Sequence, residues 1–192
     1  MPRHPALGPT AAALSALLTL TACKGSPEAG RPNTAPTSPS SASTPTPTPT
    51  DSSASQAAAA QTAYRAYMAA KVSTATSGGK NVAGLSKVAT GIMLKTELNQ
   101  AATYRGQGWH AIGNIVVVWT KPLKMGAAGA DGQIAEITVQ ACLDASKATT
   151  VDAQGKNVKD PGTPTRWIDE MQMHFAQGTW KAYYGMNRAS QC

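Results

Sequence analysis

The stretch Gln133–Ser146, with the sequence QIAEITVQACLDAS, decides the fold because apolar and polar residues alternate along it. Successive side chains of a β-strand point to opposite faces of a sheet, so a period of two residues predicts a strand with one apolar and one polar face. The apolar face carries Ile137, Val139, Ala141 and Leu143. The opposite face carries Glu136, Thr138, Gln140, Cys142 and Asp144.

Further strands are predicted on both sides of this stretch. Trp109–Pro122 contains a β-branched run bounded by glycine and proline, and Thr149–Val158 is typical of a hairpin. Thr165–Ala176 and Thr179–Asn187 are predicted to be two strands joined at a tight turn. One predicted face of the first is formed by Trp167, Asp169, Met171, Met173 and Phe175, and one face of the second by Trp180, Ala182, Tyr184 and Met186.

Three helices are predicted before the strands. Gln56 to about Ser73 is rich in alanine, with large residues at helical spacings of three and four. Val82–Val88 favours a short second helix, and a third begins at Gly91 and ends near Gly106. The third is expected to present Leu94, Leu98, Ala101 and Ala102 on one face. Helices followed by an antiparallel meander predict an α+β domain.

The chain opens on a short basic segment and an apolar run, Ala11–Leu20, that is followed by Leu20-Thr21-Ala22-Cys23. The run is shorter than the roughly 20 residues that span a bilayer, which favours a signal peptide. The four residues resemble the lipobox of bacterial lipoproteins. That resemblance implies that residues 1–22 are removed and that Cys23 is lipidated. The alternative is an ordinary secreted protein with an unmodified Cys23.

Residues 23–55 are dominated by proline, serine, threonine and alanine. Such a segment buries too little apolar surface to offset its ordering entropy, so we expect a disordered stalk. All of the aromatic residues lie from Tyr64 onward, which places the folded domain at residues 56–192.

The formal charge of +7 falls to +6 when the signal peptide, whose one charged residue is Arg3, is removed. Outside a cell membrane this charge favours anionic lipid headgroups or anionic wall polymers as partners; the alternative is that it serves solubility alone. An export signal and the lack of a dense basic cluster argue against nucleic acid.

Cys142 and Cys192 remain after Cys23 is assigned to lipid. An even pair in an exported chain predicts a disulfide, whose loop of about 50 residues corresponds to roughly 4 kcal/mol in the chain-entropy model. Two separate buried thiols are the alternative. A zinc site is disfavoured because no histidine accompanies either cysteine locally.

The helices-then-strands order resembles the NTF2-like or SnoaL-like cone fold, in which N-terminal helices pack into a curved antiparallel sheet. Together with the lipobox, the Thr/Pro stalk, Ala141–Asp144 and the Asp152–Gly155 turn, residues 56–192 resemble stalked lipoproteins of actinobacteria. A cystatin-like sheet with a differently packed helix is the nearest alternative.

The many aromatic residues are expected to serve core packing, and the functional alternative is an apolar pocket in the mouth of the cone. Asp169 lies among apolar residues on its strand, which raises a carboxyl pKa and suits a base. Relatives in the ketosteroid isomerase group use an acidic base with a tyrosine donor, roles that Asp169 and Tyr184 would fill, but no motif matches residue by residue. The predicted pocket consists of Trp109, Trp167, Asp169, Met171, Met173 and Tyr184.

The sequence contains no recognisable catalytic, metal-binding or cofactor-binding motif. We therefore expect a lipid-anchored, non-enzymatic envelope protein at the outer face of the cell membrane, which binds an envelope protein or a small apolar ligand. The alternative is an enzyme of the ketosteroid isomerase type that acts on a small apolar substrate.

Overall fold

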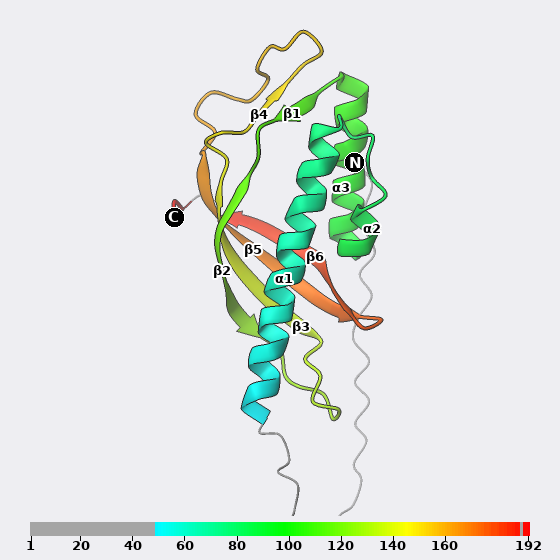
Figure 1. Cartoon of the computed structure of the whole chain (residues 1–192), viewed down its shortest axis with the longest axis vertical. Helices are drawn as coiled ribbons and strands as arrows, with labels where there is room; N and C mark the ends of the chain where they lie inside the picture. The colour runs from blue at the N-terminus through cyan, green and yellow to red at the C-terminus, as the bar shows by residue number, and fades with distance from the viewer. Residues whose placement is uncertain (1–48, 189) are drawn as a thin grey trace, which may run out of the picture. The chain divides into compact units, whose positions relative to one another are not determined.

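The computed structural model describes residues 49–188 and 190–192 (Figure 1). The expected signal peptide, Cys23 and most of the expected stalk lie outside these residues. Three helices precede six strands, and the α+β prediction is confirmed. The elements are α1 (Pro49–Thr76), α2 (Leu85–Val88), α3 (Gly91–Gln107), β1 (His110–Ile112), β2 (Val116–Met125), β3 (Glu136–Asp144), β4 (Thr149–Val151), β5 (Arg166–Ala176) and β6 (Thr179–Arg188).

Four strands form an antiparallel sheet in the order β2-β3-β5-β6, and β1 pairs with β4 in a separate two-stranded sheet. In the register of β3 and β5, Val139 lies opposite Met171 and Ala141 opposite Asp169. The apolar residues of the two strands therefore occupy the same inner face. The predicted alternation of β3 is confirmed, because Ile137, Val139 and Ala141 are all fully buried.

Helix α1 lies along the inner face of the four-stranded sheet, as Figure 1 shows. Tyr64, Tyr67 and Met68 from α1 are buried against this face, and Met93 from α3 joins them. The inner face is thus covered by helix. The opposite, outer face of the sheet carries ion pairs such as that between Arg188 and Glu170, at 2.9 Å.

The helices differ from the predictions at two places. Helix α1 begins at Pro49, so residues 49–55, which were expected to belong to the stalk, are helical. The buried residues of α3 are Met93, Glu97 and Ala101, whereas Leu98 and Ala102 are exposed. The prediction was correct for Ala101 and for Leu94, which is half-buried against the core, and wrong for Leu98 and Ala102. Glu97 is buried in α3 because it has hydrogen-bond partners, which let a charged residue lie in the interior.

Strand β6 contains a β-bulge that changes which side chains face inward. The pairing skips Tyr183, so Tyr184 lies opposite Gln172 and Ala182 opposite Met173. Tyr184 is therefore on the outer face and is 43% exposed, and Gly185 lies opposite Met171. The predicted inward positions of Tyr184 and Met186 were wrong for this reason.

The predicted strand 109–122 is divided into β1 and β2 at Gly113. This residue has a φ of 75°, and a Cβ added to it would lie 1.8 Å from the carbonyl oxygen of Lys147. Only glycine fits such a close approach. The break lets β1 leave the main sheet and pair with β4.

The sulfur atoms of Cys142 and Cys192 are bonded at 2.04 Å, as predicted. The bond joins β3 to the C-terminal residue on the outer face of the sheet. Within residues 49–188 and 190–192, no helix is long and apolar enough to cross a membrane, and no cluster of His, Cys, Asp and Glu is arranged to hold a metal ion.

Candidate ligand-binding cavity

A cavity of about 210 Å³ lies between the C-terminal half of α1, helix α3 and the β1–β4 pair. A single water molecule needs only about 10–15 Å³ by the same kind of measure. The space is therefore an order of magnitude larger than a site for one water, and it is large enough for a small ligand.

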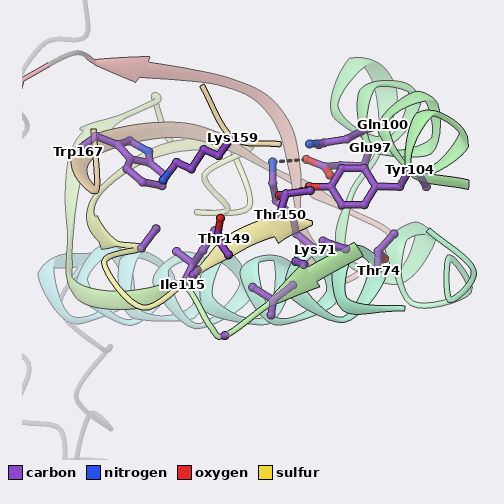
Figure 2. Close-up of a pocket in the computed structure, with 17 residues that line it drawn as sticks. Lys71, Thr74, Glu97, Gln100, Tyr104, Ile115, Thr149, Thr150, Lys159 and Trp167 are labelled. Atoms are coloured by element: carbon purple, nitrogen blue, oxygen red, sulfur yellow. Dashed lines mark hydrogen bonds and ion pairs between the residues drawn. The ribbon is translucent and has the colours of Figure 1, made fainter. Parts of the chain in front are cut away.

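The side chains that line the cavity are mostly apolar, and many of them are the single methyl groups of alanine residues. The large side chain among them is the indole of Trp167, at one end of the cavity (Figure 2). Because alanine projects only a methyl group, the elements can pack without their side chains filling the space between them. The apolar wall residues are Val72, Ala75, Ala101, Ala111, Ile115, Ala145, Ala148 and Trp167.

Gly79 sets the close approach of α1 and α3 beside the cavity. It has a φ of 76°, and a Cβ added to it would lie 2.1 Å from the carbonyl oxygen of Ala101, a wall residue. Its own carbonyl oxygen accepts a hydrogen bond from the guanidinium of Arg105 on α3. Glycine at this position therefore fixes the distance between the two helices that form one side of the cavity.

One polar end of the cavity is built around Glu97, which is 3% exposed. Its carboxylate accepts hydrogen bonds from the Tyr67 hydroxyl at 2.6 Å and from the Lys71 ammonium at 2.8 Å. Burial, together with the adjacent Glu97 charge, raises the pKa of Tyr67, so this hydroxyl remains a proton donor. Nearby, the hydroxyls of Tyr104 and Thr150 are 3.1 Å apart.

The other end of the cavity contains Trp167 and Lys159, which Figure 2 shows away from the Glu97 end. The Trp167 indole Nε1 is buried and has no hydrogen-bond partner among the described residues. The Lys159 ammonium makes no hydrogen bond or ion pair with any residue that the structure describes. This end therefore carries a cation without a protein partner among the described residues, in contrast to the Glu97 end, where Lys71 and Glu97 are paired.

Asp169 lies in the core, outside the cavity wall. It is 5% exposed, and its carboxylate accepts a hydrogen bond from the Tyr64 hydroxyl at 2.8 Å. Burial raises the pKa of Asp169, while the hydrogen bond from Tyr64 and the charge of Lys71 oppose this shift. The carboxyl lies in apolar surroundings, as the sequence indicated. However, its hydrogen-bond partner is the buried Tyr64, and it does not face the cavity.

The structure does not bring the six predicted pocket residues together. Trp167 lies on the cavity wall, and Met171 and Met173 are packed in the core beside Asp169. Trp109 is half-buried and packs edge-on against Tyr104, with ring centroids 6.3 Å apart. Tyr184 faces outward, as described above.

Most of the polar residues of the cavity wall were not predicted from the sequence. One signal was present: Tyr67 and Lys71 are four residues apart on α1, so they share a helix face, and a half-buried lysine on an inward face favours an acidic partner on a neighbouring helix. Glu97 is the acidic residue of α3. The missed wall residues are Lys71, Thr74, Glu97, Gln100, Tyr104, Thr149, Thr150 and Lys159.

No family model and no curated protein matches this chain. Among solved structures, the intermembrane-space region of the chloroplast protein ARC6 is similar, with a TM-score of 0.54 and 18% sequence identity. The match covers 70% of this chain and 97% of the ARC6 region. At this identity the likeness concerns the fold alone: both chains share an arrangement of helices and antiparallel sheet.

Proposed function

We propose that this chain is a lipid-anchored, non-enzymatic binding protein at the outer face of the cell membrane, whose domain holds a small apolar ligand in the cavity. The observation that carries the proposal is the cavity of about 210 Å³ with mainly apolar walls. Ligand sites in proteins are typically concave, mostly apolar and supplied with a few polar groups that orient the ligand. The two polar ends of this cavity fit that description.

The anchor rests on Leu20–Cys23 and the apolar run before it. Lipidation of Cys23 would attach two or three acyl chains, and two chains suffice for stable membrane binding. The stalk would then hold the domain away from the membrane. The charge of +6 on the processed chain, which follows from the total of +7 and the loss of Arg3, suits contact with anionic wall polymers or with an acidic envelope protein.

An NTF2-like cone is part of the same proposal. The antiparallel order β2-β3-β5-β6, with α1 along one face, supports it. In such a cone, a ligand would enter between the helices and the sheet. A cavity bounded by α1, α3 and the β1–β4 pair supports this part of the proposal, because one of its walls is also formed by α1.

The alternative of an enzyme based on Asp169 is less well supported. A general base must come within hydrogen-bond reach of the proton that it removes. Asp169 does not line the cavity, and Tyr64 already donates to its carboxylate. Tyr184, the proposed second donor, lies on the outer face of the sheet. These positions favour binding over catalysis.

Mass spectrometry of the protein from its own host tests both parts of the proposal in one preparation. Protease treatment of washed membranes, without detergent, releases the domain by cutting the stalk. We expect native spectra of the released domain to contain a non-covalent adduct at one copy per chain. We also expect the N-terminal peptide that stays in the membrane to carry acyl chains on Cys23.

Each part of the proposal has its own contrary result. A released domain that carries no small molecule, in preparations where the Cys23 peptide is acylated, would contradict ligand binding and leave the anchor standing. Chains that leave the membrane in a high-salt wash, with Cys23 unmodified, would contradict the anchor.

A further inference from the structure

The positive and negative charges on the cavity wall do not cancel. Lys71 and Glu97 form an ion pair at 2.8 Å, so their charges offset each other. Lys159 is the remaining charged wall residue, and no described residue pairs with its ammonium group. The wall therefore carries one excess positive charge, located at the Trp167 end.

The same end places an indole ring beside this charge. The side chains of Lys159 and Trp167 are drawn together at this end of the cavity in Figure 2. The Trp167 Nε1 is buried away from the cavity surface, so Trp167 contributes apolar surface to the wall. Lys159 is half-buried, and its ammonium group can form a charge-assisted hydrogen bond with an anionic acceptor beside the indole.

We infer that the ligand is an anionic amphiphile, with its apolar part among the alanine walls and against the Trp167 indole and its anionic headgroup at Lys159. This inference rests on the proposed function, since it assigns the chemistry of the same site. Lys159 is on a loop and has a flexible stem, so its ammonium can follow the headgroup. The headgroup is a carboxylate or a phosphate, because both accept hydrogen bonds and carry the required charge.

Other ligand classes fit this cavity less well. An organic cation would face the unpaired Lys159, and the one carboxylate on the wall, Glu97, is already bonded to Tyr67 and Lys71. A neutral hydrocarbon beside Lys159 would displace water from the ammonium group without offering it an acceptor. A polyanion would need several cations, and the wall supplies only one unpaired cation among the described residues.

Calorimetric titrations with ligands that differ only in their headgroup test the inference. The protein is the full processed chain, residues 23–192, produced without lipid by a Cys23→Ser change. The four probes are decanoate, decyl phosphate, decanol and decylamine. We expect at least one of the two anions to bind about tenfold tighter than decanol, a difference of about 1.4 kcal/mol. Decylamine should bind most weakly. The tighter anion identifies the headgroup as carboxylate or phosphate.

Lys159→Met is the matched variant, because methionine keeps an unbranched apolar stem and removes the charge. We expect it to lower the affinity of the preferred anion about tenfold, so that the anion no longer binds tighter than decanol. Lys156→Met on the same loop is the control, since Lys156 is exposed and does not line the cavity. It should leave all of the affinities unchanged.

Salt provides a second readout that needs no variant. Higher ionic strength should weaken the binding of the anion and leave that of decanol unaffected. Equal binding of decanol and both anions, or an anion advantage that persists in Lys159→Met, would overturn the inference while the proposed function stands. Failure of all four probes to bind would contradict the proposed function itself.

Discussion

Replacing Gly79 by alanine is expected to lower the free energy of unfolding by about 3 kcal/mol. The added Cβ would lie 2.1 Å from the carbonyl oxygen of Ala101, and a left-handed φ of 76° is strained for any residue with a Cβ. The obstacle is backbone, so it cannot be relieved by rotating a side chain. The helices α1 and α3 must move apart. Urea denaturation followed by far-UV circular dichroism measures the change.

Gly106→Ala is the matched control for this prediction. Gly106 lies in α3, and a Cβ added to it would meet no atom within 4 Å. Because alanine has a higher helix propensity than glycine, we expect this variant to be more stable by about 0.5 kcal/mol. A Gly79→Ala protein as stable as the Gly106→Ala protein would show that the approach of α1 to α3 is not as close as described.

Cys192→Ser is expected to lower the free energy of unfolding by about 4 kcal/mol, because the disulfide that it removes restricts the unfolded chain. The bond spans a sequence separation of 50 residues. Cys192 is exposed at the end of the chain, so the substitution removes little other packing. Guanidinium denaturation under oxidising conditions measures the difference.

Treatment with a reducing agent distinguishes the effect of losing the disulfide from the effect of changing the Cys192 side chain. Wild-type protein in excess dithiothreitol should fall to the stability of Cys192→Ser, and the variant should not respond to dithiothreitol. If the wild-type protein loses less than about 1 kcal/mol on full reduction, the unfolded chain is not restricted as the loop-entropy argument requires.

The order of helices and strands was predictable from the sequence, because the spacing of apolar residues along the chain matches the side chains that are buried in the fold. In β3 each inward residue is apolar and each outward residue is polar or, for Cys142, bonded, so the period of two was unambiguous. Glycine and proline marked the turns between strands. These signals need no knowledge of distant contacts, which is why the α+β arrangement of helices followed by antiparallel strands is confirmed. The pairing of β1 with β4 depends on such contacts and was not predicted.

The missed features depend on contacts between elements. The bulge at Tyr183 leaves the alternation of β6 intact in sequence and reverses its faces only through pairing with β5. The burial of Glu97 depends on donors from α1, Tyr67 and Lys71. A polar residue on a helix is expected to face solvent until its partners are known, so Glu97 was left out of the predicted inner face of α3.

The cavity was unpredictable for a related reason. Alanine is the best helix former, so an alanine such as Ala75 in α1 indicates helix and says nothing about an empty space beside it. The predicted pocket was based on large aromatic and apolar side chains. Two of these, Met171 and Met173, fill the core instead. The space lies where small side chains of several elements face one another, and only the packing of those elements reveals it.

The central claim is that the cavity binds a small apolar ligand, and filling it tests that claim most directly. Ala75→Leu projects a larger side chain from α1 into the cavity, whereas Ala66→Leu places the same side chain on an exposed position of the same helix. The measurement is a fluorescence titration with the neutral dye N-phenyl-1-naphthylamine, which does not depend on the headgroup inference. We predict saturable binding to the wild-type and Ala66→Leu chains and an affinity about tenfold lower for Ala75→Leu, about 1.4 kcal/mol. Equal affinity of all three chains, or no saturable binding to any of them, would contradict the account.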